Sequence, residues 1–112
     1  MCNSSQLSKI IQGIVLAYRT VYGSAIKEIL LYGSYARGDN NSQSDIDFVA
    51  IVDGDRLELQ TKLAKVWDAA ADLGLEHDAV ISPVVIPYTE FLKYRDKLPY
   101  YRNIEQEGRR IG

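Results

Sequence analysis

The sequence has few features that would connect it with an oxidising compartment or a membrane. It contains one cysteine, Cys2, so an internal disulfide is excluded. No apolar run approaches the roughly 20 residues that a membrane-spanning helix needs, and no signal-peptide pattern precedes the first amphipathic segment. These absences favour a cytoplasmic protein without a membrane segment.

A basic surface is also lacking. The 13 Lys and Arg residues are outnumbered by 15 Asp and Glu residues, giving a formal net charge of -2. Binding of nucleic acid regardless of its sequence depends on neutralising several phosphates at once, so we expect none here. Any contact with phosphate has to be local.

The length allows one hydrophobic core. A chain of 112 residues, 46% of them hydrophobic, can bury enough surface to fold without disulfides or a structural metal. We therefore expect one domain over residues 1–112, with a core from 26 to 86 and a helical tail from 89 to 112.

Hydrophobic periodicity predicts an alternation of helices and strands. The first helix ends at Gly23, and a later helix begins at Arg56 and ends at Gly74. The β-branched and aromatic run 46–52 has apolar residues on both sides, so both of its faces should be covered. The predicted helices are one that Ser4 or Ser5 caps and Gly23 ends, a short one from Ser34, 56–73, 89–97 and 99–106, and the predicted strands are 26–32, 46–52 and 78–86.

This order predicts an α+β fold, in which a small mixed sheet of three or more strands packs against helices. Pro83 cannot donate a hydrogen bond to a neighbouring strand, so the third strand should lie at an edge or contain a bulge. Arg109 and Arg110 are most simply a solvated end.

Two carboxylates, Asp45 and Asp47, stand at the head of the second strand. Alternation places them on one face, with Cβ atoms roughly 6.5 Å apart. At an effective dielectric constant near 20, their repulsion would cost about 2 to 3 kcal/mol. A divalent cation relieves this repulsion, and Mg²⁺ prefers one or two carboxylates together with substrate phosphates. The pair therefore predicts a metal site for nucleotide chemistry.

The preceding strand ends at Gly33-Ser34, which could hold the phosphates. Glycine lets a phosphate approach the backbone, and Ser34 adds a hydroxyl donor and the start of a helix. The spacing Gly33 to Gly38 matches the opening of a P-loop, but the Lys that this motif requires is replaced by Asp39. Arg37 is a further candidate phosphate contact, with a solvated loop arginine as the alternative.

Gly33-Ser34, ten intervening residues and Asp45-Ile46-Asp47 together resemble the signature of the DNA polymerase beta-like nucleotidyltransferases, in particular the minimal nucleotidyltransferases. The wording "GSYARGD" and the tail "PYYRNIEQEGRRI" are similar to members of this family. The resemblance implies the polymerase beta-like fold, with Gly33 and Ser34 as ligands of a nucleoside triphosphate. It also implies that Asp45 and Asp47 bind two Mg²⁺ ions.

The family has a third carboxylate on a later strand that completes the metal site and helps to activate the acceptor hydroxyl. Asp78, at the head of the predicted third strand, is our choice for this role. Glu76 has the same parity and is the alternative if the strand begins earlier.

The resemblance implies transfer of a nucleoside monophosphate, AMP from ATP or its equivalent from another triphosphate, to an acceptor hydroxyl. Minimal members are similar to antitoxins that modify a partner toxin of the HEPN type, so we expect such a partner in a homo- or hetero-oligomer. The alternatives are transfer to a small molecule such as an aminoglycoside, or a binding module without catalysis. A partner-binding surface on the tail could be formed by Tyr88, Tyr94, Tyr100 and Tyr101.

Overall fold

The computed structural model describes residues 4–38 and 45–112, so Cys2 lies outside the described part. In this part no helix is long and apolar enough to cross a membrane. The elements, in chain order, are α1 (Ser4–Tyr22), a 3₁₀ turn (Gly23–Ala25), β1 (Ile26–Tyr32), α2 (Ser34–Arg37), β2 (Ile46–Val52), α3 (Arg56–His77), β3 (Ile81–Pro87), α4 (Tyr88–Tyr94), α5 (Pro99–Glu107) and β4 (Arg109–Arg110).

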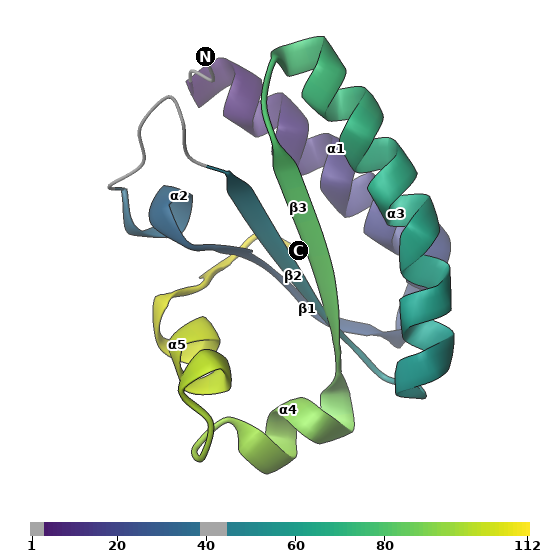
Figure 1. The fold of residues 1–112 in the computed structure, drawn as a ribbon, viewed down its shortest axis with the longest axis vertical. Helices are drawn as coiled ribbons and strands as arrows, with labels where there is room; N and C mark the ends of the chain where they lie inside the picture. The colour runs from purple at the N-terminus through teal and green to yellow at the C-terminus, as the bar shows by residue number, and fades with distance from the viewer. Residues whose placement is uncertain (1–3, 39–44) are drawn as a thin grey trace.

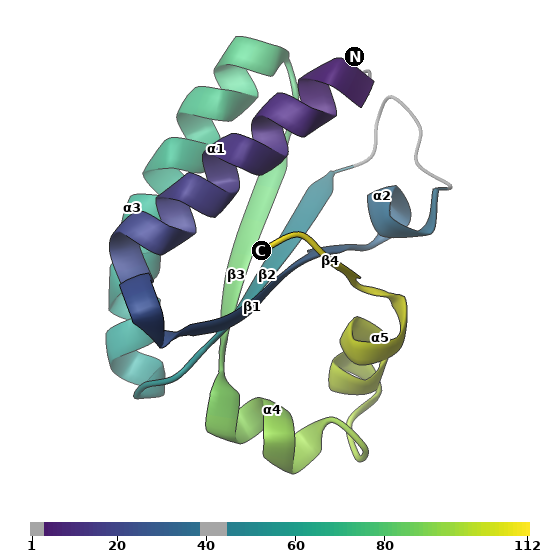
Figure 2. The same ribbon diagram turned by 180° about the vertical axis from the view of Figure 1, so that it is seen from behind.

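The four strands form one mixed sheet in the order β3-β2-β1-β4. β1 pairs antiparallel with both β2 and β4, whereas β2 and β3 are parallel. Helices α1 and α3 lie side by side over one face of this sheet, and α4 and α5 lie on the other side (Figures 1 and 2). The predicted α+β class and its mixed sheet are therefore confirmed.

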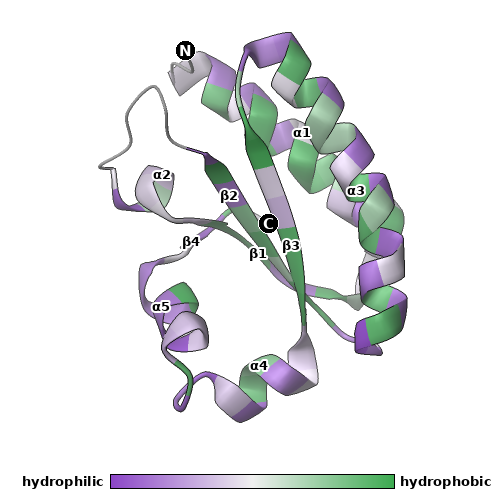
Figure 3. Ribbon diagram, viewed as in Figure 1, coloured by the Kyte–Doolittle hydropathy of each residue, from purple (hydrophilic) through white to green (hydrophobic). Residues whose placement is uncertain are grey.

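Alternation along β2 divides the buried side chains between two cores. Phe48 and Ala50 belong to the core under α1 and α3, whereas Val49 and Ile51 belong to the core under α4 and α5. In Figure 3 the ribbon of β2 is accordingly green along most of its length. Because Asp47 has the same parity as Val49 and Ile51, its side chain lies on the α5 side of the sheet.

β3 is an edge strand, as Pro83 predicted. The Ile46 N–H donates to the Val80 carbonyl at 2.9 Å, which sets the phase of the parallel ladder between β2 and β3. In such a ladder every second residue of a strand faces its neighbour, so Pro83 and Pro87 both face the open edge. The two prolines therefore cost no hydrogen bond inside the sheet and reduce the donors on its exposed side.

The predicted boundary between the long helix and the third strand is wrong. We expected the helix to end at Gly74 and the strand to cover 78–86, but α3 continues to His77 and β3 begins at Ile81. Asp78 ends the helix in the left-handed conformation, with φ 52° and ψ 54°. Gly74 lies within the last turn of α3, where a Cβ would be 2.6 Å from the Ala79 carbonyl oxygen. This glycine therefore lets the chain turn back closely after the helix, but it is not the residue at which the helix ends.

The tail differs from expectation in its last residues. Its helices are close to the predicted ranges 89–97 and 99–106, but Arg109 and Arg110 are not a free end. Their side chains are exposed while their backbone pairs with β1 opposite Leu30 and Leu31. The tail thus supplies a fourth strand, which fixes where α5 lies on the sheet.

One buried hydroxyl ties α1 to the sheet. The Tyr18 side chain is fully buried, and its hydroxyl donates to the Val84 carbonyl at 2.8 Å, with the Phe48 carbonyl at 3.4 Å. Burial also raises the Tyr18 pKa well above its ordinary value, so the phenol stays a hydrogen-bond donor at physiological pH.

We expect Tyr18→Phe to lower the free energy of unfolding by about 0.5 to 1.5 kcal/mol, the usual net contribution of one hydrogen bond. Urea denaturation would measure this as an earlier midpoint with an unchanged slope. Tyr94→Phe is the matched control, because Tyr94 is only half-buried, and it should change stability by less than about 0.5 kcal/mol. Equal effects of the two substitutions would contradict a structural role for the Tyr18 hydroxyl.

Candidate functional site

The centre of the candidate site is a close approach between Gly33 and Asp47. Gly33 has φ 78° and ψ -153°, a conformation that favours glycine, and it directly precedes α2. A Cβ on this residue would lie 2.6 Å from the Asp47 Oδ2 atom. The end of β1 can therefore lie against this carboxylate only if residue 33 has no side chain. Tyr32, the last residue of β1, is paired directly with Asp47 across the two strands.

Asp45 and Asp47 stand two residues apart at the start of β2. Asp47 is half-buried on β2, and Asp45 is exposed just before the strand. Burial raises the Asp47 pKa, and the negative charge of Asp45 raises it further. The two carboxylates are thus close enough to repel each other, and the folded protein bears this cost unless a cation neutralises it.

Ser34 is the first residue and Arg37 the last residue of the short helix α2, beside Asp47. The Gly33 carbonyl accepts hydrogen bonds from the Ala36 N–H at 3.0 Å and the Arg37 N–H at 3.1 Å. The Arg37 guanidinium is 3.8 Å from the Glu107 carboxylate at the end of α5. Both side chains are about 40% exposed, so the pair is solvated and Arg37 can exchange partners.

Asp78 is not brought to this pair. It caps the C-terminus of α3, exposed to solvent, and Glu76 is exposed in the last helical turn beside His77. The described ranges 4–38 and 45–112 contain no group of three His, Cys, Asp or Glu residues that could hold a metal ion. The residue of β3 that is level with Asp47 is Ser82. The parity argument for Asp78 and Glu76 assumed a strand that begins earlier than the real one.

The residues present nevertheless fit a magnesium ion. Two neighbouring carboxylates that repel each other supply hard oxygen donors, and proteins commonly hold Mg²⁺ with one or two carboxylates plus substrate phosphates. Asp45 and Asp47 would be its protein ligands.

The tail contributes side chains that the sequence did not assign to the site. The ring of Tyr100, at the start of α5, lies 6.1 Å from the ring of Tyr32 at an interplanar angle of 84°. Burial is the largest cause of the raised Tyr32 pKa. The charges of Glu107 and Asp47 raise this pKa further, and the charge of Arg37 lowers it. The first and last turns of α5 thus both reach the Asp47 face. The only sequence signal for a contact between α5 and the site was the resemblance of the tail "PYYRNIEQEGRRI" to the family. That resemblance does not show which residues of the tail lie opposite which residues of β1.

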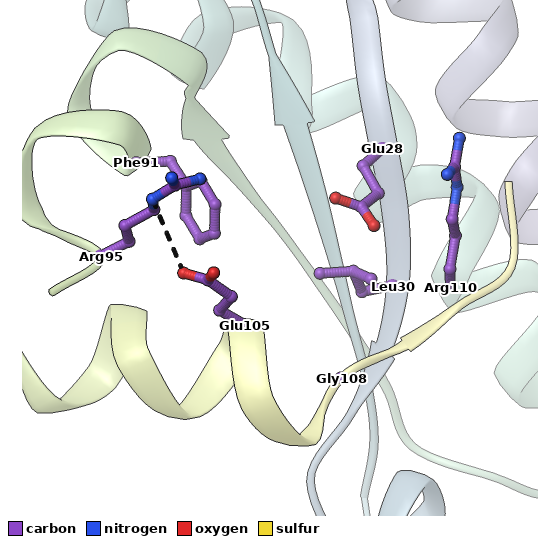
Figure 4. Close-up of a pocket in the computed structure, with 7 residues that line it drawn as sticks. All are labelled: Glu28, Leu30, Phe91, Arg95, Glu105, Gly108 and Arg110. Carbon is purple, nitrogen blue, oxygen red and sulfur yellow. Dashed lines mark ion pairs between the residues drawn. The ribbon is translucent and has the colours of Figure 1, made fainter.

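A separate pocket of about 170 Å³ lies on the same sheet face. Its lining residues are Glu28, Leu30, Phe91, Arg95, Glu105, Gly108 and Arg110, and Figure 4 shows the ion pair between Arg95 and Glu105 on its helical side. This pair, at 3.8 Å, joins the end of α4 to α5. None of the predicted site residues lines this pocket, so it is not the candidate site.

Relatives of the chain are nucleotidyltransferases. Residues 11–111 match the family described as "Nucleotidyltransferase domain". The protein of Methanocaldococcus jannaschii named "Putative protein adenylyltransferase MJ0604" is 35% identical over 101 residues, which cover 90% of this chain and 93% of that protein.

Solved structures share the fold. One, titled "Crystal structure of the toxin-antitoxin with AMP-PNP", has a TM-score of 0.56 and 19% identity, and the match covers 89% of this chain and 70% of that chain. Another, a tri-AMPylated Shewanella oneidensis HEPN toxin in complex with MNT antitoxin, has a TM-score of 0.50 and 17% identity, covering 92% of this chain and 69% of that chain. With the family match spanning residues 11–111, the fold and the Gly33-Ser34 and Asp45-Asp47 motif lead to one conclusion: the chain belongs to the nucleotidyltransferase domain family.

Proposed function

We propose that this nucleotidyltransferase moves AMP from ATP to a hydroxyl group on a partner protein of the HEPN toxin type, in a reaction that depends on Mg²⁺. The single observation that carries the proposal is the approach of the Asp47 carboxylate to Gly33, with Asp45 beside it. Two neighbouring carboxylates beside a glycine at the start of a short helix are an arrangement suited to handling a metal-bound triphosphate.

The relatives support the choice of nucleotide and acceptor. The relative from Methanocaldococcus jannaschii carries the name of a protein adenylyltransferase, and the structural neighbours include complexes of toxin with antitoxin. One of those complexes holds AMP-PNP, an analogue of ATP, and another contains an AMPylated HEPN toxin. These features are carried to the present chain as part of the proposal.

Each site residue has a role in this reaction. Gly33 and Ser34 would contact the triphosphate, and Arg37 would leave Glu107 to pair with a phosphate oxygen. Asp45 and Asp47 would hold Mg²⁺, which supplies charge neutralisation at the phosphate oxygens during transfer. The acceptor hydroxyl attacks the α-phosphorus, the bond to the β-phosphate breaks, and pyrophosphate leaves in line with the attack. The number of ions, two by family resemblance, stays a prediction.

Asp47→Asn should abolish transfer of radiolabelled AMP while the protein stays folded, because it removes one of two metal-binding carboxylates without changing side-chain shape. Asp53→Asn is the matched control: Asp53 is exposed just beyond the other end of β2 and should leave the rate within about twofold. If the wild type transfers AMP to an aminoglycoside without any second protein, the acceptor is a small molecule and not a partner protein. Wild-type rates in the Asp47 variant would refute the site itself.

Asp78→Asn should keep most of the activity, because Asp78 caps α3 outside the Asp45 and Asp47 pair. The same transfer assay, run beside Asp47→Asn, distinguishes the two positions. A loss as large as that of the Asp47 variant would show that Asp78 is the third carboxylate after all, as the sequence predicted, and that the end of α3 rearranges when substrate binds.

The raised Asp47 pKa predicts how stability depends on pH without metal. Below about pH 4 both folded and unfolded states hold the proton, and the carboxylate costs the fold nothing. As the pH rises, the unfolded state loses this proton first, so the wild type becomes less stable relative to Asp47→Asn until the folded carboxyl has ionised too. Melting temperatures from pH 3 to pH 8 in EDTA should therefore diverge with rising pH. Millimolar Mg²⁺ and ATP should raise the melting temperature of the wild type more than that of the variant.

A further inference from the structure

A tyrosine of the protein itself lies beside the carboxylate of the candidate site. Tyr32 and Asp47 are directly paired across β1 and β2, so their side chains share one face with Cβ atoms roughly 4.5 to 5.5 Å apart. The Tyr100 ring meets the Tyr32 ring edge-on at 6.1 Å. Tyr100 is therefore separated from Asp47 by one side chain, that of Tyr32, although it is more than fifty residues away in the sequence.

Electrostatics agrees with this geometry. Burial raises the Tyr100 pKa, and Tyr32, Asp47 and Tyr101 raise it further.

Tyr100 differs from the neighbouring tyrosines in the space around it. Tyr32 and Tyr101 pack against the core under α4 and α5, whereas Tyr100 is not part of that core and is 48% exposed. A nucleotide attached to Tyr32 or Tyr101 would have to displace core contacts. The same group on Tyr100 could extend into solvent.

Helix α5 also holds this residue in place. Ile104 is fully buried under the helix, and Glu107 at its end pairs with Arg37 of α2. Because α5 is anchored to the sheet at its middle by Ile104, and directly after its end by the pairing of β4 with β1, Tyr100 is presented to the site by a fixed element.

Building on the proposed function, we infer that Tyr100 is an acceptor for the protein's own nucleotidyl transfer, so that without a partner the protein adenylylates itself. The Tyr100 hydroxyl oxygen would form a bond to the α-phosphorus of ATP while the bond from that phosphorus to the β-phosphate bridging oxygen breaks. Pyrophosphate leaves with the electron pair of that bond, and the phenol proton passes to solvent water. The products are AMP-tyrosine and pyrophosphate, and no further reactant is needed.

The test uses the full chain alone with ATP and Mg²⁺, and intact-protein mass spectrometry followed by peptide mapping. We expect a mass increase of one AMP, located on Tyr100, in the wild type and in Tyr101→Phe. Tyr101 is the matched control, because it is the adjacent tyrosine on α5 but its ring packs against Phe91 and Tyr94. Tyr100→Phe and Asp47→Asn should both remain unmodified.

The design separates failure of this inference from failure of the proposed function. Binding of ATP is measured in parallel, as the rise in melting temperature with Mg²⁺ and ATP. A clear Asp47-dependent rise without any AMP on the protein, or with AMP on Tyr32 or Tyr101 instead, would overturn the role of Tyr100 and leave the nucleotide site standing. If the melting temperature does not rise and no AMP is found on the protein, both the role of Tyr100 and the proposed nucleotide site are refuted. Modification of Tyr100 in the Asp47 variant would show that the label does not come from this site.

Discussion

The contact on which the site depends is the approach of the Asp47 carboxylate to Gly33. It requires β1 and β2 to pair in the register that sets Tyr32 opposite Asp47, and it requires a residue without Cβ at the turn into α2. A shift of one residue in this register would move every side chain of β2 to the other face. Phe48 would then leave the core under α1 and α3, and Asp47 would enter it. The hydrophobic core and the site are therefore fixed by the same pairing.

The other wall of the site comes from the far end of the chain. α4 and α5 cover the sheet face that carries Asp47, and ring contacts run from Phe91 through Tyr101 and Tyr100 to Tyr32. A forked ion pair, in which the Arg56 Nη2 atom is 2.5 Å from Glu90 Oε2, joins the start of α3 to α4. Exposed pairs of this kind contribute little stability, but a two-point contact restricts orientation. The tail is thus held at α4 and at β4, and α5 lies over the site between these two attachments.

Sequence reasoning succeeded where the information is local. The ranges of β1 and β2 were predicted to the residue, because apolar runs ended by Gly33 and by Asp53-Gly54 have clear limits. Gly33 and the two aspartates could be found because the motifs that contain them, Gly33-Ser34 and Asp45-Ile46-Asp47, are short and continuous in the sequence. Asp78 was misplaced because glycine is a frequent helix end, whereas here Gly74 lies inside α3 and Asp78 ends the helix in the left-handed conformation.

Contacts between distant segments could not be predicted at all. Nothing in "PYYRNIEQEGRRI" shows that Tyr100 would reach Tyr32 or that Glu107 would pair with Arg37, since both depend on how α5 crosses β1. That crossing is set by the two residues of β4, which have no apolar pattern and were read as a solvated end. Short edge strands gain their stability from the strand they join rather than from their own side chains. The sequence of such a strand therefore holds little information about its position.

The residue level with Asp47 on β3 is a serine, and this has a chemical consequence. Ser82 has one hydroxyl, which cannot act as a base at neutral pH, so it cannot take the proton of an acceptor that approaches along β3. Asp45 and Asp47 would be occupied as ligands of Mg²⁺ during transfer, which weakens them as bases. A phenol suits such a site better than an alcohol, because its pKa near 10 makes it easier to deprotonate. In the proposed reaction this set of side chains would thus favour tyrosine as the class of acceptor, whether the tyrosine belongs to a partner or to helix α5 of the protein itself.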